Sequence, residues 1–383
     1  MRLRQLQLDR HPDRRHRRDR PGTPPGPGAL RPARGAGRLD RDHDDRHHRR
    51  RADQPRGLSA VASCNGPRVV VVGSFNVDHV WQCDALPRPG ETRIGQYRTG
   101  PGGKGFNQAT ACARSGAATV FVCALGEDEG ANLARSLAAA DGIDLRTEPS
   151  EEPTGTAGIY VDREGRNSIV IGAGANGALT PDFVARQGEA IVGSRIVLAQ
   201  LESPVDSVLE AMRLARSAGV RTVLNPAPAN AESSRELLAV ADILTPNESE
   251  FAALLARHSG ERIDAAEVAA ADEARLHRLC RVLLPRGTVV ITLGAAGAFV
   301  SHREDKCRGD ELPYYRVPAY EVAVVDTTGA GDAFNGALAT SLALGGERVF
   351  ADHVRFASHY AALSTEHEGA AEAMPRLPSS RPA

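Results

Sequence analysis

The chain has 383 residues, of which 41% are hydrophobic and 25% charged, a composition typical of soluble globular proteins and long enough for two or three domains. No stretch approaches the roughly 20 apolar residues that a membrane span requires, and the Arg-rich start lacks the apolar core of a secretory signal. The six cysteines are scattered without a CxxC pair, which argues against a disulfide framework or a zinc site and favours a cytoplasmic protein.

The net charge of −1 hides two regions of different character. Residues 1–57 contain 17 Arg and 8 Asp with no Lys or Glu, a net of +9, and the rest of the chain carries −10. Residues 1–66 show no helical or strand periodicity and are rich in Pro, Gly, Arg and Asp, so we expect a disordered extension. It is either a solvated tail or a basic arm for anionic partners. The interleaved Asp and the lack of aromatic residues favour the tail, and we expect no nucleic-acid binding.

Residues 67–383 have the pattern of a folded domain. Short β-branched runs alternate with Ala-rich amphipathic stretches, as in βαβ units around a parallel sheet. The expected strands are residues 68–73, 119–125, 196–201, 222–224, 243–244 and 289–293, and the expected helices are residues 106–114, 130–140, 205–217 and 249–257. The sequence therefore predicts an α/β fold that binds its ligands beyond the carboxyl ends of the strands.

Two segments interrupt this alternation. Residues 80–98 and 156–171 alternate polar and apolar side chains without a helical period, and Gly165 sits in a hairpin turn between strands. These segments predict extra antiparallel strands outside the main sheet, which would form a small lid over the ligand site.

The most specific string is DTTGAGDAFN at residues 326–335, where a glycine-rich turn leads into an Ala/Leu-rich helix. The backbone amides of Gly329, Ala330, Gly331 and Asp332 would face an anion, helped by the positive end of the helix dipole. A carboxylate beside such an anion hole is poorly placed to hold phosphate but well placed to take a proton from an attacking hydroxyl. Asp332 is therefore the candidate general base, and the alternative is an ordinary first-turn helix residue.

Residues 100–109, GPGGKGFNQA, form a second glycine-rich loop. It is not a Walker loop because Lys104 is followed by Gly, and no strand runs into it as a dinucleotide fingerprint requires; the GxGxxG at residues 172–177 is not followed by a helix. Gly103 lets the backbone approach a ligand closely, and Lys104 and Asn107 can bind hydroxyl groups. The chain contains only two lysines against 45 arginines, and one of the two is Lys104.

Polar residues also follow other strands. Asn76 and Asp78 share one face of an extended segment and can hold two sugar hydroxyls, with an Asx turn as the alternative. Asn247 and Glu250 fit a helix capping box, or they can bind the water shell of Mg²⁺ near phosphates. Two further strand ends are followed by Glu202 and by the sharp turn at residues 292–297, where a nucleotide can lie.

Together these strings resemble the ribokinase-like family of sugar kinases over about residues 67–375. The matching strings are GSFNVD at 73–78, GGKGFNQ at 102–108, QLESP at 200–204, NPAP at 225–228, TPNESE at 245–250, ITLG at 291–294 and DTTGAGDAFNG at 326–336. The resemblance implies a three-layer α/β/α sandwich with a β lid, and ATP-dependent phosphorylation of the 5-hydroxyl of D-ribose. It also implies Mg²⁺ with the ATP, K⁺ as activator, and a homodimer formed through the lid.

The family's roles, carried over by position, fall on most of the candidate residues, with Asp332 as the general base. The sugar would be held by Asn76, Val77, Asp78, Gly103, Lys104, Gly105, Phe106, Asn107, Glu202 and Asp332. ATP would contact Asn247, Thr292, Leu293, Gly294, Ala295, Ala296, Gly297, Gly329, Ala330, Gly331, Asp332 and Ser358. Glu250 would bind Mg²⁺ through water, and K⁺ would lie near Asp326, Thr328, Ser364, His367, Gly369 and Ala373. Ala373 stands where family members usually have a hydroxyl side chain.

Two alternatives stay open. A kinase of another pentose, sugar or nucleoside would use the same fold and base, although members acting on adenosine rarely combine Lys104 with Asn107 and Gln108. Members acting on fructose phosphates have Val where Gln108 stands. A catalytically inactive sugar-binding regulator would not need an intact Asp332.

Overall fold

The computed structural model describes residues 68–346 and 348–378. The chain divides into two units, residues 1–61 and 62–383, and every described residue belongs to the second. The expected disordered extension at residues 1–66 lies outside the described residues. No helix in the described part of the chain is long and apolar enough to cross a membrane.

Within the described residues, nine strands form one sheet in the order β13-β12-β11-β10-β9-β8-β1-β4-β5. The strands are β1 (Arg68–Val72), β4 (Ala118–Leu125), β5 (Asp144–Pro149), β8 (Ile196–Ala199), β9 (Arg221–Leu224), β10 (Ile243–Leu244), β11 (Thr288–Thr292), β12 (Ala298–Ser301) and β13 (Tyr314–Val317). Neighbours from β5 to β11 pair in parallel, and β12 and β13 add an antiparallel edge. The mostly parallel sheet expected from the sequence is confirmed.

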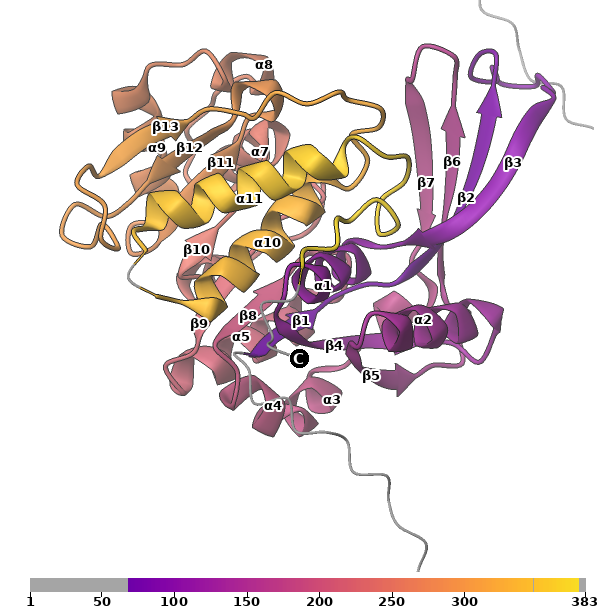
Figure 1. Ribbon diagram of the computed structural model, residues 1–383, viewed down its shortest axis with the longest axis horizontal. Coiled ribbons are helices and arrows are strands. Elements are labelled where there is room, and N and C mark those ends of the chain that lie inside the picture. The colour runs from indigo at the N-terminus through magenta and orange to yellow at the C-terminus, as the bar shows by residue number, and fades with distance from the viewer. Residues whose placement is uncertain (1–67, 347, 379–383) are drawn as a thin grey trace, which may run out of the picture. The chain divides into compact units, whose positions relative to one another are not determined.

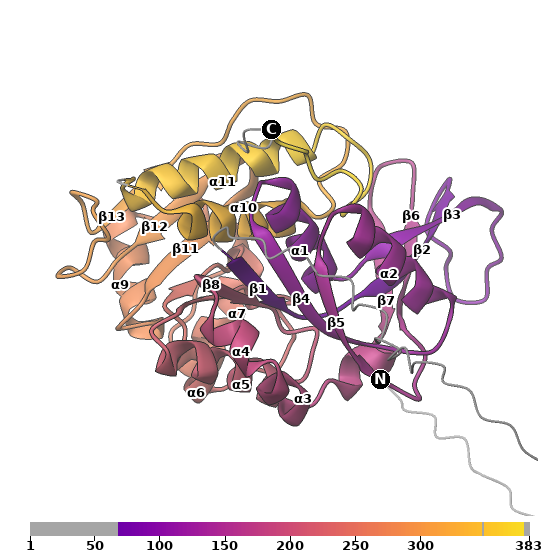
Figure 2. The same ribbon diagram turned by 60° about the horizontal axis from the view of Figure 1, so that its bottom comes forward.

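The sheet is covered by helices on both faces. Val69, Val70, Val71 and Val72 of β1 are completely buried, as in a parallel strand enclosed from two sides. One face carries α1 (Lys104–Arg114), α2 (Glu129–Ala140), α10 (Ala330–Leu344) and α11 (Phe350–Ser364). The other carries α3 (Pro181–Arg186), α4 (Gly188–Val192), α5 (Val205–Ser217), α6 (Arg235–Ala239), α7 (Glu248–His258), α8 (Ala265–Val268) and α9 (Glu273–Leu283). The expected three-layer arrangement is therefore present (Figure 2).

Helix starts follow two local patterns. Asp128, Ser234 and Asp272 precede α2, α6 and α9, and each accepts a hydrogen bond from a first-turn amide of its helix. Helices α1 and α10 instead begin after Gly103 and Gly329, without a side-chain cap. Both of these helices begin at the candidate site.

A separate sheet of four strands forms the lid, in the order β3-β2-β6-β7, and projects from the body of the domain in Figure 1. Its strands are β2 (Asn76–Cys83), β3 (Gly95–Gly102), β6 (Gly155–Val161) and β7 (Asn167–Gly172). The prediction of an antiparallel lid is wrong for the central pair, because β2 and β6 run parallel. Strand β2 continues from β1 and β6 follows β5, and since β1 and β5 point the same way in the main sheet, both lid strands leave it in the same direction.

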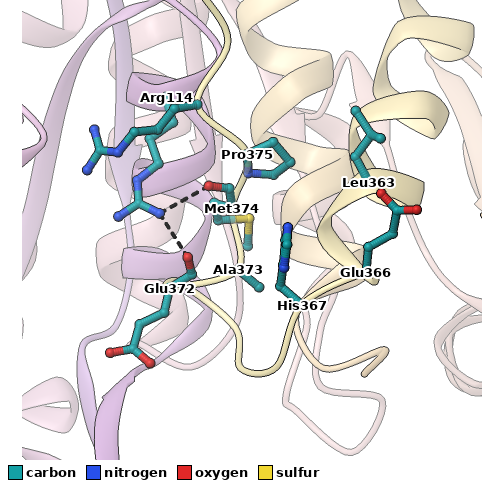
Figure 3. Close-up of a pocket in the computed structure, with 9 residues that line it drawn as sticks. Arg114, Leu363, Glu366, His367, Glu372, Ala373, Met374 and Pro375 are labelled. Carbon is teal, nitrogen blue, oxygen red and sulfur yellow. Dashed lines mark hydrogen bonds between the residues drawn. The ribbon is translucent and has the colours of Figure 1, made fainter. Parts of the chain in front are cut away.

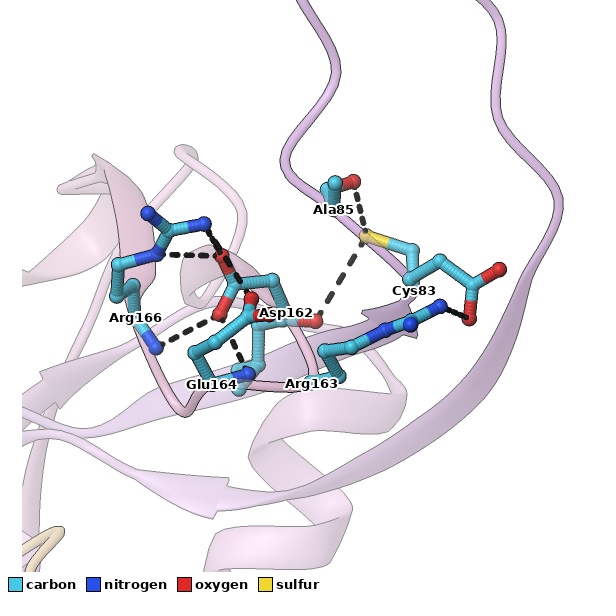
Figure 4. A network of polar contacts seen from close by, with 8 residues as sticks. Cys83, Ala85, Asp162, Arg163, Glu164 and Arg166 are labelled. Carbon is cyan, nitrogen blue, oxygen red and sulfur yellow. Dashed lines mark hydrogen bonds and ion pairs between the residues drawn. The ribbon is translucent and has the colours of Figure 1, made fainter.

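Side-chain contacts close the far end of the lid (Figure 4). Asp162 accepts hydrogen bonds from the amides of Glu164 and Arg166, at 3.1 and 2.9 Å, and from the Arg166 guanidinium. It thereby fixes the turn between β6 and β7. At the end of β2, the Cys83 thiol donates to the carbonyl of Ala85 at 3.1 Å and lies 3.7 Å from the carbonyl of Val161 in β6. The pairing of Gln82 with Val161 joins the two parallel strands at their tips.

Candidate active site

The residues proposed for catalysis and sugar binding meet at the carboxyl edge of the parallel sheet. They come from the chain after β1 (Asn76 and Asp78), the loop after β8 (Glu202), and the first turns of α1 (Lys104, Asn107) and α10 (Asp332). Ligands of open α/β sheets bind at this edge, because the strands end there and their loops diverge.

Asp332 is 6% exposed and lies in the first turn of α10, which begins at the left-handed Gly329 (φ 75°). Asn107 donates to its Oδ2 and Gln108 to its Oδ1, both at 2.9 Å. Burial raises the pKa of Asp332 above its ordinary value, although Lys104 and the two amides act in the opposite sense. A Cβ added at Gly331 would meet no atom within 4 Å, so the turn faces open space. The carboxylate is therefore held as a proton acceptor beside room for a ligand.

Lys104 is surrounded by carboxylates. Burial by itself would lower the pKa of Lys104, but the charges of Asp332, Glu202 and Glu250 outweigh it and raise that pKa. The ammonium group therefore stays charged at neutral pH. A half-buried cation among these carboxylates is placed to stabilise negative charge on a bound substrate.

The two carboxylates on the sugar side are held differently. Oε2 of Glu202 accepts hydrogen bonds from Ser74 Oγ at 2.6 Å and from the Lys104 amide at 3.0 Å. The pKa of Asp78 is raised to about 7, chiefly by burial and then by the charge of Glu202. Glycine at position 102 leaves room for the Asp78 carboxylate, because a Cβ there would lie 2.2 Å from its oxygens and would force that side chain to move. Asp78 can thus exchange a proton near neutral pH.

Asn76 and Gly103 are fixed by the backbone around them. Asn76 is 3% exposed, and its Oδ1 accepts a hydrogen bond from Asn176 Nδ2 at 2.8 Å. Gly103 has a φ of 87°, and a Cβ there would lie 2.8 Å from the Asn76 amide nitrogen. The glycine-rich loop therefore packs directly against the strand that carries Asn76 and Asp78.

Three of the residues expected to bind sugar offer it no side chain, because two face the core and the third is a glycine. Phe106 is buried against Phe75, with ring centroids 5.1 Å apart, and belongs to the core. Val77 alternates with Asp78 along β2 and packs on the core cluster under α2. Gly105 packs against Ser74, whose amide nitrogen would lie 2.4 Å from an added Cβ. At these three positions only the backbone can face a ligand.

The nucleotide-side residues also lie together. Asn247 and Glu250 form the capping box of α7, with both carboxylate oxygens of Glu250 bonded to Asn247. Asn247 forms a bridge with Thr292 at the end of β11. Beyond it, Gly294, Ala295 and Ala296 form an exposed 3-10 turn that ends at Gly297 (φ 85°), whereas Leu293 is buried in the core. Ser358 lies half-buried on α11, beside His359, which stacks on Tyr320 at 4.6 Å.

The residues expected around K⁺ come from two adjacent loops that Asp326 joins. Its Oδ1 accepts from the amide and hydroxyl of Thr328, at 2.9 and 2.6 Å, and its Oδ2 accepts from the Gly369 amide at 2.9 Å. These bonds lower the pKa of Asp326, although burial acts to raise it. The hydroxyl of Ser364 donates to the carbonyl of Ala361 within α11, at 2.8 Å, and its oxygen keeps lone pairs that can face a cation.

The second of these loops is held in place by Arg114, at the end of α1 (Figure 3). Its guanidinium donates to the carbonyls of Ala371 and Met374, at 3.0 and 3.1 Å. A cavity of 370 Å³ lies beside this contact, and His367 and Ala373 line it. Among the described residues, no group of three or more His, Cys, Asp or Glu side chains is arranged to hold a metal ion.

Sequence reasoning missed several residues that support the site. Asn176 bonds the backbone of Phe75 as well as Asn76, and it lies in the 172–177 string whose glycines drew attention only as a rejected dinucleotide fingerprint. Gln200 and Asn225 bond Gln108 from two different strand ends. Their shared signal is a polar residue directly after a buried strand, and their partners are about 100 residues away in the chain.

Comparisons with known proteins show the family of the chain. The family model described as pfkB family carbohydrate kinase matches residues 67–377. A ribokinase of Haemophilus influenzae is 41% identical over 313 residues, which cover 80% of this chain and 95% of that protein. A bifunctional ribokinase/ribose-5-phosphate isomerase A of Fructilactobacillus sanfranciscensis is 40% identical over 314 residues, 80% of this chain, and the chain spans 54% of that longer protein.

A solved structure gives the same comparison at the level of the fold. The structure of Arabidopsis thaliana ribokinase complexed with ribose and ATP is similar with a TM-score of 0.66 and 31% sequence identity. The similarity covers 81% of this chain and 96% of that chain.

Proposed function

The chain belongs to the pfkB family of carbohydrate kinases, and we propose that it is a ribokinase, which uses ATP to phosphorylate the 5-hydroxyl of D-ribose and releases ribose 5-phosphate and ADP. One observation carries the proposal. Asp332, Lys104 and the sugar-side carboxylates Asp78 and Glu202 lie within mutual electrostatic influence at one edge of the sheet. Relatives of similar length that are named ribokinases support ribose as the sugar.

In the proposed reaction, the 5-hydroxyl oxygen of ribose attacks the γ-phosphorus of ATP. A bond forms between that oxygen and phosphorus, the bond from phosphorus to the β,γ-bridging oxygen breaks, and ADP leaves with the electron pair. Asp332 takes the hydroxyl proton. Phosphoryl transfer depends mainly on positioning and charge stabilisation, and the amides of Gly329, Ala330 and Gly331 with the α10 dipole would stabilise the transferred group.

Unused polar atoms indicate where the sugar would bind. Asn107 Oδ1 is buried and has no hydrogen-bond partner among the described residues, while its Nδ2 donates to Asp332. An unpaired buried carbonyl costs about 1–3 kcal/mol, which a sugar hydroxyl would recover. Within the described part of the chain, no hydrogen bond uses Oε1 of Glu202, so this oxygen is also available to a hydroxyl.

Magnesium would accompany ATP in this reaction. Both oxygens of Glu250 are bonded to Asn247, which fits binding through water molecules rather than direct ligation. The ion would neutralise charge on the phosphates. Asn247 and Glu250 would hold its water shell from the start of α7.

Potassium would bind between the loops that Asp326 joins. These loops would offer the cation the backbone carbonyls around Thr328, Ser364 and Gly369 and the carboxylate of Asp326. Such oxygen ligands suit a hard monovalent cation. Ala373 adds no side-chain oxygen. The cation would support the conformation of the turn at Gly329.

Two further features belong to the proposal. The lid exposes Tyr97 of β3 and Val170 of β7 on one face, and Ile169 and Ile171 of β7 on the other. A second copy of the chain would cover exposed apolar side chains of the lid in a homodimer. A cytoplasmic location suits the five unpaired cysteines of the described residues, because thiols persist in a reducing compartment. Light scattering of the purified protein measures the dimer directly.

The function is tested by ADP release from purified protein with Mg-ATP and a panel of ribose, deoxyribose, fructose, adenosine and fructose phosphates, with and without K⁺. Release that depends on ribose supports the proposal. Release with another substrate keeps the family and replaces ribose. A folded protein that binds ribose without releasing ADP would instead be a sugar-binding regulator.

A further inference from the structure

Gln108 touches the proposed base and has no role in the reaction described so far. It is completely buried in α1, so it does not face the ligand space. Its Nε2 donates to Asp332 Oδ1 at 2.9 Å and to Asn225 Oδ1 at 3.0 Å, and its Oε1 accepts from Gln200 Nε2 at 2.5 Å. Both amide hydrogens and the carbonyl oxygen are therefore used.

The direction of these hydrogen bonds is set by the backbone. The carbonyl of Thr245 is only an acceptor, so the Nδ2 of Asn225, 2.9 Å away, must face it. Asn225 then presents Oδ1 to Gln108, which must answer with Nε2. Gln108 consequently cannot rotate its amide, and it offers Asp332 Oδ1 a donor and never an acceptor.

The other oxygen of Asp332 has a different neighbour. Oδ2 accepts from Asn107 Nδ2, and the Oδ1 of Asn107 has no partner among the described residues. No protein contact fixes which way this amide is turned. If a proton arrives on Asp332 Oδ2, Asn107 can turn its carbonyl oxygen toward it, whereas Gln108 cannot make the same adjustment at Oδ1.

We propose that Gln108 is a positioning residue that makes Oδ2 of Asp332 the atom that accepts the proton from the substrate hydroxyl. The inference rests on the proposed function, since it assumes that Asp332 is the base. Gln108 holds Oδ1 as a permanent acceptor, turns Oδ2 toward Asn107 and the sugar, and favours the ionised carboxylate before the reaction. Asn225 and Gln200 act through Gln108 by fixing its orientation.

The pH dependence of the reaction reports this contact. The hydrogen bond from Gln108 lowers the pKa of Asp332, so its loss raises that pKa. The titratable groups that face Asp332 from the packed elements are Lys104 of α1, Glu202 after β8, Asp78 of β2 and Glu250 of α7. Saturating sugar keeps Asp78 and Glu202 bound to the substrate. Under these conditions the pH dependence of the single-turnover rate follows the protonation of Asp332.

The test compares Gln108→Met and Gln108→Glu with the wild type in single-turnover rate against pH, at saturating Mg-ATP and ribose. Gln108→Met removes the donor, and we expect the acidic limb to move to higher pH and the rate at pH 7 to fall about 10- to 100-fold. Gln108→Glu keeps the shape and places a second carboxyl against Asp332, so the acidic limb of its pH–rate profile should move further toward high pH. The KM for ribose should change by no more than about twofold, because Gln108 contacts no substrate.

Two controls separate the possible causes. Asp310→Asn changes another buried carboxylate, which bonds His302 at the opposite edge of the sheet, and should keep the wild-type pH profile. Asp332→Asn, measured alongside, tests the base itself. If Asp332→Asn is inactive while both folded Gln108 variants keep the wild-type limb and rate, the inference about Gln108 is wrong and the proposed function stands. If Asp332→Asn retains turnover, the proposed base is wrong and the inference falls with it.

Discussion

Two buried polar clusters lie at opposite edges of the same sheet, and they differ in whether their hydrogen bonds are complete. At the amino edge, His302 Nδ1 lies 3.0 Å from Thr288 Oγ1, and its Nε2 lies 2.9 Å from Asp310 Oδ2. The Tyr315 hydroxyl and the Ala351 amide bond the same Asp310 carboxylate. We call Thr288, His302, Asp310 and Tyr315 the His302 cluster.

The cluster at the carboxyl edge contains Asn107, Gln108, Gln200 and Asp332, and it is incomplete. Within the described residues, the buried atoms without a partner include Asn107 Oδ1 and Gln200 Oε1, and none belongs to the His302 cluster. The Thr-His-Asp order of the His302 cluster matches a hydrolase triad in chemistry only, because its members are buried and bonded to one another. Gln200 Oε1 packs against Gly73 inside the protein, whereas Asn107 Oδ1 belongs to the side chain that bonds the proposed base, so Asn107 Oδ1 is the unpaired atom that a ligand can use.

The largest expected effect comes from Asp332→Asn. The amide keeps the shape of the site but cannot take the hydroxyl proton, so turnover should fall by about 10²- to 10⁴-fold. Ribose binding by calorimetry should persist, because Asp78, Glu202 and Lys104 are intact. Turnover close to that of the wild type would remove Asp332 as the base and with it the contrast between the two clusters.

Lys104→Met should have the next largest effect. The substitution removes the half-buried cation that acts on Asp332, Glu202 and Glu250, so the rate should fall about 100-fold and the pKa of Asp332 should rise. The matched control is Lys306→Met, which changes the other lysine of the chain, an exposed one. Steady-state kinetics of the two variants should differ sharply; equal, small losses would show that Lys104 is a structural residue.

Asp310→Asn should lower the stability of the protein without lowering its activity. Replacing the shared acceptor leaves His302 and Tyr315 with a poorer partner in a buried place, and the free energy of unfolding should fall by about 1–3 kcal/mol. The kcat/KM for ribose should stay at the wild-type value, because no member of the His302 cluster reaches the site. Urea unfolding and kinetics on the same sample measure both. A loss of kcat/KM without loss of stability would contradict a structural role.

Acidification should destabilise the protein through His302. Burial lowers the pKa of His302 below the ordinary value of 6.5, and Asp310 only partly opposes this. The unfolded chain therefore binds a proton at a pH where the folded chain does not, so stability is present above about pH 6.5 and is lost as the pH falls toward the folded-state pKa. The slope is at most about 1.4 kcal/mol per pH unit for one group. His302→Gln should flatten the dependence of the unfolding free energy on pH between pH 5 and 7. An unchanged slope would assign this dependence to other histidines.

The smallest expected effect is at Ala373. Ala373→Ser restores a side-chain hydroxyl beside the proposed K⁺ loops, in a loop that Arg114 already holds in place. The K⁺ concentration for half-maximal activity should fall by a few-fold, roughly the value of one weak hydrogen-bonding ligand. Initial rates over a K⁺ titration, with Na⁺ keeping the ionic strength constant, measure this change. A potassium response identical to the wild type would place the cation elsewhere.

The sequence predicts the carboxyl-edge site better than the network beneath it. The strings around Lys104 and Asp332 are local, and their glycines indicate where a ligand approaches the backbone. The partners Gln200 and Asn225 come from separate strand ends, and the parallel order of β8 and β9 brings both of them to Gln108 of α1. No local pattern encodes such a contact.

Other differences have equally specific causes. Strand β8 ends at Ala199, before the expected residue 201, because Leu201 already bonds the carbonyl of Ala227 in the loop that follows β9. Alternation of side chains located the lid strands but not their direction, since period two is the same in parallel and antiparallel pairs. The side chain of Phe106 lies in the core because one face of α1 packs on Phe75.

The most direct test of the account is ³¹P NMR of the product that the wild-type protein makes from Mg-ATP and D-ribose. The account predicts one new phosphate monoester, attached to carbon 5, formed in equal amount with ADP and absent when Asp332→Asn replaces the wild type. A phosphate on another carbon, or no phosphorylated sugar from a folded protein that binds ribose, would contradict the claim that the incomplete cluster at the carboxyl edge is a ribose 5-kinase site.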